Sequence, residues 1–480
     1  MSSTLTNLSW KFAERISSQL VSFVVSIVLA RILAPSDYGA IAMVMIFVTL
    51  ANVFVEGGFS SALIQKKDAD KLDFSTVFYF SVVFSIILYA VLYISAPYIS
   101  RFYGKDYEIL TPVLRVIGLQ VIVFGVNSVQ QAYVSRKMMF KKFFWSTLVG
   151  TIVSAAVGLI MAYSGYGIWA LVGQQLTSAI TNTVVLYLVT RKLPGLMFSF
   201  QRLKGLFGYG AKIMGTHLLI AVFNNVRSLV IGKLYSAKDL ALFDKGGQFP
   251  SLLMNNINSS LGAVLFPKMS QEQDNRLRVK ETIRNSIRFS SFIVMPLMLG
   301  LAACAEPFIR LLLTDKWVGC VPYLQLFCLT YMFYPLHTAN MQAIKALGKS
   351  GIFLKLEIIK KTLELLSLFL VMRISVMAIA INMTILATLF IFVNSYPNKK
   401  LLNYSLKEQI SDITPSLSNA FIMAIIVYCI GMVQFPDAII LAIQIFVGVF
   451  VYVILSKITH NKEMKFLLNL ILKKNHYVKK

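Results

Sequence analysis

The chain has 480 residues, of which 57% are apolar and only 14% are charged, and its mean hydropathy is +0.70. Soluble domains carry about 25% charged residues, so this composition excludes an ordinary soluble protein. The formal net charge of +25 would suit a nucleic-acid partner, but the positions of the basic residues indicate a different one.

Apolar runs of about 20 residues, the length that crosses a bilayer, recur along the whole chain. They predict an all-α polytopic membrane protein with about fourteen transmembrane helices, because a segment in lipid must satisfy its own backbone polar groups. The predicted spans lie near residues 12–33, 38–64, 75–99, 109–134, 144–163, 166–189, 206–231, 239–266, 286–309, 321–344, 352–372, 374–395, 415–432 and 437–456.

Most of the 46 lysines and arginines lie in the N-terminal segment, the even-numbered loops and the C-terminal tail. Short loops rich in Lys and Arg stay on the cytoplasmic side, so both termini are predicted to be cytoplasmic. The same distribution indicates anionic lipid head groups, and not nucleic acid, as the partner of the positive charge. The tail at 460–480 is expected to form a basic amphipathic helix on the inner membrane surface.

Two segments of the chain are versions of one another. Residues 97–114 read PYISRFYGKDYEILTPVL and residues 307–324 read PFIRLLLTDKWVGCVPYL, with Pro97 on Pro307 and Pro112 on Pro322 at one offset. The repeats begin six spans apart, and an even number of spans preserves direction. We therefore predict two parallel six-helix lobes related by a pseudo-twofold axis along the membrane normal, plus two extra C-terminal helices.

This repeat predicts three parts of the chain. Residues 1–200 would form an N-lobe with helices 1–6, and residues 201–398 a C-lobe with helices 7–12. Residues 399–480 would hold helices 13 and 14 and the basic cytoplasmic tail.

The sequence gives little indication of catalysis. The loops are too short for a soluble catalytic domain, and Asp68-Ala69-Asp70, which matches a pattern of sugar-nucleotide enzymes, is interpreted as a solvated loop. His217 and His337 have no partners at metal-ligand spacing, and the four cysteines have no metal or redox spacing. We therefore expect no enzyme, no catalytic residue, no metal and no cofactor.

Charges inside predicted spans are informative, because each costs about 2.5–3.5 kcal/mol on membrane insertion. In span 206–231, Lys212 and Arg227 share a helical face, with Asn224 and Asn225 beside it. In span 239–266, Lys245, Gln248 and Asn256 share a face. These stripes predict a water-filled cavity, with snorkelling of the long basic side chains to the membrane surface as the alternative.

Three other spans carry polar faces. In span 38–64, Glu56 and Asn52 lie on a face that is either a coupling or gating site or ordinary interhelical packing. Gln120, Asn127 and Gln131 form a similar face in span 109–134. In span 352–372, two pairs at i,i+4 spacing are expected to neutralise each other, namely Glu357 with Lys361 and Lys360 with Glu364.

Several segments carry a family resemblance. RILAPSDYG (31–39), FSSALIQ (59–65) and the stretch 228–250 resemble the Wzx-type polysaccharide flippases of lipopolysaccharide, O-antigen or colanic-acid type. These form the polysaccharide transport family of the multidrug/oligosaccharidyl-lipid/polysaccharide (MOP) flippase superfamily. The resemblance covers nearly the whole chain and is weaker in the last two spans.

The resemblance implies that the chain moves undecaprenyl-pyrophosphate-linked oligosaccharide from the cytoplasmic to the periplasmic leaflet of a bacterial inner membrane by alternating access. An anionic diphosphate needs cations, and a glycan needs amides or hydroxyls. The candidates for the diphosphate or an acidic sugar are Lys212, Arg227 and Lys245. Those for sugar hydroxyls are Asn224, Asn225, Gln248 and Asn256, and those for coupling or gating are Glu56 and Asn52.

Two alternatives remain open. A cation-coupled multidrug antiporter of the same superfamily would have an acidic, aromatic-lined cavity, and a polysaccharide polymerase or ligase would have a large outer loop. The expected partners are the lipid-linked glycan and membrane lipid, together with a polysaccharide polymerase and a chain-length regulator. We expect a functional monomer and no nucleic acid.

Overall fold

The computed structural model describes residues 2–56, 58–191, 195–433 and 435–464, and the regular structure within these ranges is helical. The elements are α1 (Ser2–Ile32), α2 (Pro35–Glu56), α3 (Phe59–Gln65), α4 (Lys71–Tyr103), η1 (Lys105–Tyr107), α5 (Leu110–Ile117), α6 (Leu119–Arg136), α7 (Phe140–Tyr163), α8 (Ile168–Thr190), α9 (Phe200–Leu234), α10 (Ala237–Gln271), α11 (Arg276–Ala303), α12 (Ala305–Leu313), η2 (Asp315–Cys320), α13 (Val321–Tyr331), α14 (Tyr334–Ala346), α15 (Ser350–Val371), α16 (Val376–Leu402), α17 (Leu406–Ile430) and α18 (Asp437–Ile458).

Every predicted span falls on one of these helices or on a consecutive pair of them. Within the described ranges, ten segments are long and apolar enough to cross a membrane. The other four predicted spans fall on α8, α10, the pair α13–α14 and α15. The all-α, multi-pass membrane protein is therefore confirmed, while the count of fourteen crossings stays a prediction. The predicted amphipathic tail helix lies mostly at 465–480, outside the described residues.

The helices form two compact units, residues 1–241 and 242–480. The boundary between the units differs from the lobe boundary predicted after residue 200, because α9 packs on α2, α3 and α4 of the first unit. The predicted lobes were defined by the repeat and not by packing. The division into compact units does not test the predicted lobes, which stay a prediction.

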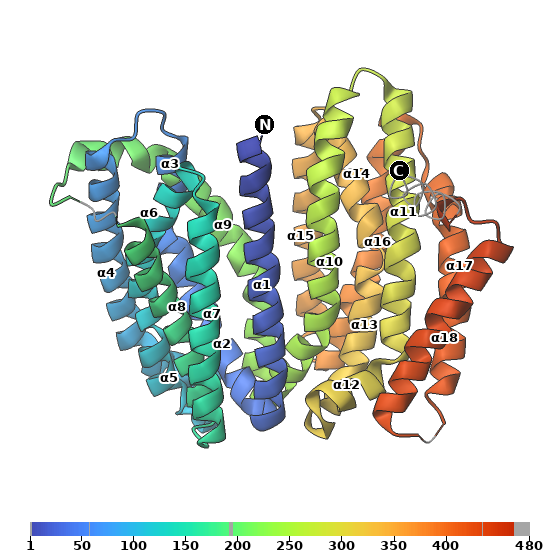
Figure 1. Cartoon of the computed structure of the whole chain (residues 1–480), viewed down its shortest axis with the longest axis horizontal. Coiled ribbons are helices and arrows are strands. Elements are labelled where there is room, and N and C mark those ends of the chain that lie inside the picture. The colour runs from blue at the N-terminus through green and yellow to red at the C-terminus, as the bar shows by residue number, and fades with distance from the viewer. Residues whose placement is uncertain (1, 57, 192–194, 434, 465–480) are drawn as a thin grey trace, which may run out of the picture. The chain divides into compact units, whose positions relative to one another are not determined.

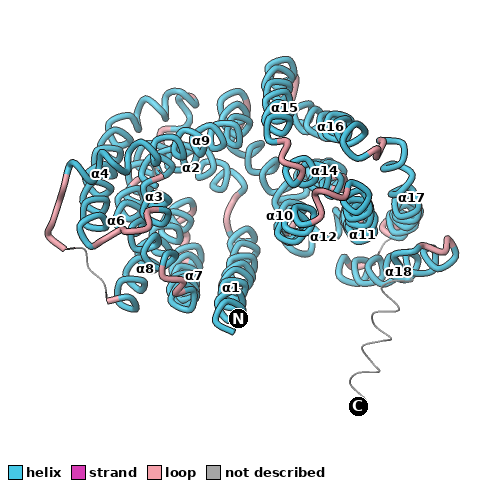
Figure 2. The backbone as a smooth tube through the Cα atoms, turned by 90° about the horizontal axis from the view of Figure 1, so that it is seen from above, coloured by secondary structure: helices cyan, strands magenta, loops and turns pink. Residues whose placement is uncertain are grey.

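In the first unit, long helices stand side by side (Figure 1). Helix α7 packs on both α1 and α8, α8 packs on α6, and α6 packs on α2 and α4. Helix α9 lies along α2 and α4, as the view from above also shows (Figure 2). An apolar cluster that includes Phe59, Leu63, Val77 and Leu206 fixes the short α3 against α4, α6 and α9.

In the second unit, α11 is the central helix and contacts α13, α14 and α17 (Figure 2). Helix α16 joins α13, α14 and α15, and α17 and α18 form a hairpin beside α11. Polar contacts hold α17 in place. Asp412 of α17 accepts hydrogen bonds from Arg284 Nη2 at 2.8 Å, from Arg288, and from the Tyr404 hydroxyl at 2.8 Å.

A buried amide network adds to this attachment of α17. Gln409 Nε2 donates to Asn340 Oδ1 at 3.1 Å, and Asn340 Nδ2 donates to Gln409 Oε1 at 2.8 Å. Asn398 Nδ2 donates to the same Asn340 oxygen at 2.7 Å. All three residues are at most 1% exposed. The two C-terminal helices are therefore a fixed part of the second unit.

The repeated segment has one local structure in both places. In each copy a helix ends, a 3₁₀ turn follows, and a new helix begins: α4–η1–α5 in the first and α12–η2–α13 in the second. Gly104 and Thr314 occupy equivalent positions and both have positive φ, with φ 142° and ψ 169° at Gly104 and φ 77° and ψ 174° at Thr314. The sequence repeat thus encodes the same unusual turn twice.

Candidate functional site

A polar pocket of about 220 Å³ lies between α6 and α8 in the first unit. Helix α6 supplies Gln120, Asn127 and Gln131, which are spaced by seven and four residues and so share a face. Helix α8 supplies an amide and hydroxyl face of its own, and Val123 and Phe124 add apolar surface. All the residues that line the pocket are uncharged: Gln120, Val123, Phe124, Asn127, Gln131, Gln175, Ser178, Ala179, Asn182 and Thr183.

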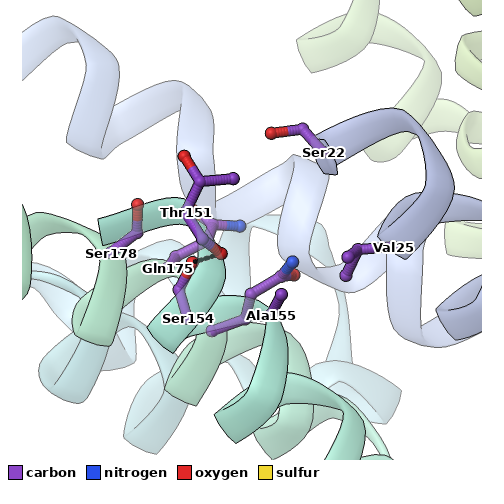
Figure 3. A pocket seen from close by; sticks show the side chains of 8 residues that line it. Ser22, Val25, Thr151, Ser154, Ala155, Gln175 and Ser178 are labelled. Atoms are coloured by element: carbon purple, nitrogen blue, oxygen red, sulfur yellow. Dashed lines mark hydrogen bonds between the residues drawn. The ribbon is translucent and has the colours of Figure 1, made fainter. Parts of the chain in front are cut away.

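A second pocket of about 220 Å³ lies between α1, α7 and α8 and shares Gln175 and Ser178 with the first. Figure 3 shows the hydroxyl and amide side chains of α7 and α8 on one side of this pocket and two residues of α1 on the other. Its lining is again uncharged and consists of Ser22, Val25, Thr151, Ser154, Ala155, Gln174, Gln175 and Ser178. The polar face of α8 therefore serves both pockets.

A small residue on α7 positions this face. A Cβ atom at Gly158 would lie 3.0 Å from the Cβ of Gln174 on α8, which is tighter than ordinary side-chain contact. Glycine thus allows close approach of α7 and α8, as small residues do between membrane helices. The close packing sets the rotation of α8, so that its amides line the two pockets.

Several polar atoms around the first pocket are buried without a partner. Gln120 is 7% exposed and Asn127 is 4% exposed. Among the described residues, the side-chain oxygens of Gln120, Asn127 and Asn182 have no hydrogen-bond donor. The arrangement can bind a neutral group that forms hydrogen bonds, and it offers no charge to an ion.

The three predicted cations lie in different surroundings. Lys212 and Arg227 are on α9 in the first unit, with Lys212 exposed and Arg227 half-buried. Lys245 is on α10 in the second unit and is only 6% exposed. Its Nζ donates to Gln248 Oε1 at 2.9 Å and lies 5.5 Å from the centre of the Trp317 ring. A shared cationic cavity stays a proposal.

The predicted amides are only partly available. Asn225 Nδ2 donates to the Ala221 carbonyl at 2.8 Å, and Asn256 Nδ2 donates to the Leu252 carbonyl at 3.1 Å, so both bond back to their own helices. Gln248 uses its oxygen for Lys245. Asn224 has an exposed side chain on α9.

The predicted coupling residues are on α2. Glu56 is the last residue of α2 and is exposed, and it interacts electrostatically with His217 of α9. Asn52 lies one turn earlier, and its Oδ1 atom is buried with no hydrogen-bond partner in the described part of the chain. Glu56 therefore lies near α9, on which α2 packs.

The Asp68–Asp70 segment has a structural role. Asp70 caps the N-terminus of α4, accepting from the Asp73 backbone N–H at 2.9 Å, and this hydrogen bond, followed by the nearby Arg202, lowers the pKa of Asp70. Asp73 in turn forms ion pairs with Lys66 at 2.6 Å and with Arg202 at 3.6 Å. The segment thus lies directly before the start of α4, and its interpretation as a solvated loop stays a prediction.

The charges of α15 do pair on their own helix, but with different partners from those predicted. Lys360 Nζ lies 2.6 Å from Glu357, and Lys361 Nζ lies 3.0 Å from Glu364, both at i,i+3. Both spacings bring side chains together on a helix, and the sequence alone does not choose between them. The expectation of i,i+4 pairs is thus corrected.

Within the described residues, no group of three or more His, Cys, Asp or Glu is placed to hold a metal ion. His337 Nδ1 lies 2.9 Å from Asn394 Nδ2, so this histidine belongs to the polar packing of the second unit. The four cysteines are free, and three of them are buried.

Sequence reasoning missed the polar face of α8. Gln174, Ser178 and Asn182 recur every fourth residue, which is the signal of one helical face. The face of α6 was recognised, but its neighbour on α8 was not, because the sequence does not state which helices pack together.

The fold is that of known membrane transporters. The structure of a lipid II flippase, MurJ, in an inward closed conformation matches 94% of this chain and 99% of that one, with a TM-score of 0.76 and 16% identity. An inward-facing multidrug resistance MATE family transporter of the MOP superfamily matches 81% of this chain and 96% of its own, with a TM-score of 0.59 and 14% identity.

Residues 28–322 match the polysaccharide biosynthesis protein family, and the chain belongs to that family. It is 24% identical to the succinoglycan biosynthesis transport protein ExoT of Rhizobium meliloti, over 72% of this chain and 70% of that protein. It is 22% identical to the teichuronic acid biosynthesis protein TuaB of Bacillus subtilis, over 63% and 62%. It is 21% identical to the lipopolysaccharide biosynthesis protein WzxC of Escherichia coli, over 68% and 66%.

The family match and these relatives confirm the resemblance to proteins of polysaccharide biosynthesis and transport. The chain spans about two thirds of the length of each of these three relatives. The name of ExoT describes transport, in agreement with the prediction that this chain is not an enzyme.

Proposed function

We propose that this protein is a flippase that moves undecaprenyl-pyrophosphate-linked oligosaccharide units from the cytoplasmic to the periplasmic leaflet of a bacterial inner membrane. The observation that carries this proposal is the combination of a polysaccharide biosynthesis family match with the fold of a lipid II flippase. Two compact helical units suit alternating access, in which one half of a transporter rocks against the other around a substrate site.

The substrate's diphosphate requires cations within the membrane. Lys212 and Arg227 of α9 are our first candidates, because an exposed and a half-buried side chain are within reach of an incoming phosphate. Hydrogen bonds between such cations and phosphate are about twice as strong as neutral ones. Lys245 is buried beside Trp317, so direct contact with phosphate there needs a rearrangement.

The remaining candidates keep secondary roles in the proposal. Asn224, Asn225, Gln248 and Asn256 would contact sugar hydroxyls near these cations, and Glu56 with Asn52 would couple or gate the movement at the α2–α9 contact. We further propose cytoplasmic termini and a functional monomer. A polymerase and a chain-length regulator would use the flipped product.

A complementation experiment in the native host tests the proposal. The gene is deleted and replaced by the wild type, Arg227→Ala or Lys212→Ala, and surface polysaccharide is measured together with lipid-linked glycan inside the cell. Loss of one charge-assisted hydrogen bond, worth about 1.5–3 kcal/mol, is expected to reduce transport by about tenfold or more. The matched control is Lys204→Ala, which removes an exposed lysine near the start of the same helix.

Two results would contradict the proposal. Normal surface polysaccharide in both variants, at a normal protein level, would show that Lys212 and Arg227 are not needed for transport. If the deletion strain had normal surface polysaccharide but increased sensitivity to cationic drugs, the multidrug antiporter would be the better assignment.

A further inference from the structure

Three side-chain oxygens around the pocket between α6 and α8 lack a hydrogen-bond donor among the described residues. Gln120 uses its amide nitrogen, which donates to the backbone carbonyl of Gln175 at 3.0 Å, and this leaves the carbonyl oxygen Oε1 without a donor. In the described structure Asn127 Oδ1 and Asn182 Oδ1 are buried and lack a donor as well. Three unpaired acceptors therefore surround one pocket.

Such an arrangement is costly unless it serves a ligand. A buried polar group without a partner costs about 1–3 kcal/mol, and apolar residues of similar shape would remove that cost. Asn127 shows this most clearly, because it is 4% exposed and lines the pocket. An amide retained there without a protein partner indicates that the partner comes from outside the chain.

The chemistry of the pocket defines the kind of partner. The three oxygens require a donor, which a phosphate or carboxylate anion does not bring at neutral pH, and the lining holds no cation to balance such an anion. A cationic donor would need an acidic counter-ion, and no residue in the lining is charged. An uncharged donor is the partner that remains, and the hydroxyl groups of a sugar are such donors.

The shape and the apolar lining favour a carbohydrate over a simple alcohol. Val123 and Phe124 offer apolar surface to the C–H faces of a sugar ring, while the amides meet its hydroxyls. Pockets for drug-sized ligands occupy about 300–1,000 Å³, so a volume of about 220 Å³ suits a single sugar residue. The neighbouring pocket, which shares Gln175 and Ser178, offers a similar surface to a second one.

We propose that the α6–α8 pocket, lined by Gln120, Asn127 and Asn182, is a sugar subsite that binds hydroxyl groups of the glycan and not the diphosphate. This inference rests on the proposed function for the identity of the substrate. It adds the uncharged amides of α6 and α8 to the residues that we propose for glycan recognition.

The test compares two lipids that differ only in the sugar. Full-length protein in lipid nanodiscs is titrated with undecaprenyl pyrophosphate and with the undecaprenyl-pyrophosphate-linked oligosaccharide purified from a host that lacks this protein. The variant is Asn127→Leu combined with Asn182→Leu, which replaces unpaired amides by apolar groups of similar size. Gln120 is left intact, because its nitrogen holds α8.

The double variant is expected to bind the glycosylated lipid about tenfold more weakly than the wild type does, which is a loss of about 1.4 kcal/mol in binding free energy. Its affinity for undecaprenyl pyrophosphate should not change. Its melting temperature should stay the same or rise, because the side-chain oxygens of the replaced amides have no donor among the described residues. The control Asn340→Leu removes a fully hydrogen-bonded buried amide, so it should lower the melting temperature without a selective effect on the glycosylated lipid.

An equal loss of affinity for both lipids, or no loss for either, overturns the sugar subsite. If the wild type binds neither lipid, the proposed function fails, and the subsite is then decided by a third probe, the oligosaccharide released from the lipid. Binding of that probe by the wild type but not by the double variant supports the subsite, and equal binding or no binding by both overturns it.

Discussion

The turn shared by the two repeats leads to a prediction about backbone strain. Thr314 has φ 77° and ψ 174°, a region that is essentially restricted to glycine, and the equivalent residue of the first repeat is Gly104. Threonine branches at Cβ, which makes this backbone conformation harder to accommodate. We expect Thr314→Gly to stabilise the second unit.

The size of the effect follows from opposing contributions. A residue held in such a region costs about 1–3 kcal/mol, and the Thr314 hydroxyl is also buried without a partner among the described residues. Glycine loses more backbone freedom on folding, at a cost of about 0.5–1 kcal/mol. The net gain should be about 1 kcal/mol, or about 2–4 °C in melting temperature for a unit of this size.

The native cysteines provide the assay. All four, Cys304, Cys320, Cys328 and Cys429, lie in the second unit, and three of them are buried, so a thiol-reactive dye reports unfolding of that unit. The control is Thr314→Ala, which removes the hydroxyl but keeps a Cβ in the strained conformation. If Thr314→Gly melts no higher than Thr314→Ala, the attribution to backbone strain is wrong.

Two further predictions concern polar contacts in each unit. Asp412→Asn removes the negative charge that pairs with Arg284 and Arg288, and it should destabilise the second unit by about 3 kcal/mol. This value is near the lower end for broken buried ion pairs, because the Arg284 side chain is 37% exposed. The thiol assay measures the loss of stability, and Asp274→Asn, at an exposed position, is the control. Arg136→Ala removes hydrogen bonds to the backbone carbonyls of Leu63, Lys66 and Lys67 at the end of α3. The amide hydrogens of α3 should therefore exchange with solvent at least about tenfold faster. The exchange rates of α18 should not change and serve as the control. Unchanged exchange in α3 would show that apolar packing alone holds this helix.

Much of the fold could be predicted because hydropathy is a local property of the chain. Each predicted span corresponds to a helix or a helix pair. The charges of α15 form ion pairs on their own helix, as predicted, although the individual partners differ. The prediction did not include the break between α5 and α6 or that between α13 and α14. Both breaks fall within apolar stretches, where average hydropathy carries no signal for an interruption.

The candidate site was harder to predict, because it depends on contacts between helices. The face of Gln120 and Asn127 was visible in the sequence, but its meaning changed when the amides of α8 were found opposite to it. Lys245 shared a predicted face with Gln248, and the structure shows the two bonded to each other in a buried position. Helical periodicity gives the face of a residue and not what that face contacts.

The sequence by itself determined that this is an all-helical membrane protein, because long apolar runs leave the backbone no other way to satisfy its hydrogen bonds in lipid. It also showed that the segment is repeated, since the two copies share their prolines at one offset, whereas the 3₁₀ turn and the positive φ of Gly104 and Thr314 were seen only in the structure. Only the tertiary structure decided which polar side chains meet. That choice depends on the rotation of each helix, which close packing between helices such as α7 and α8 fixes and which no single segment encodes.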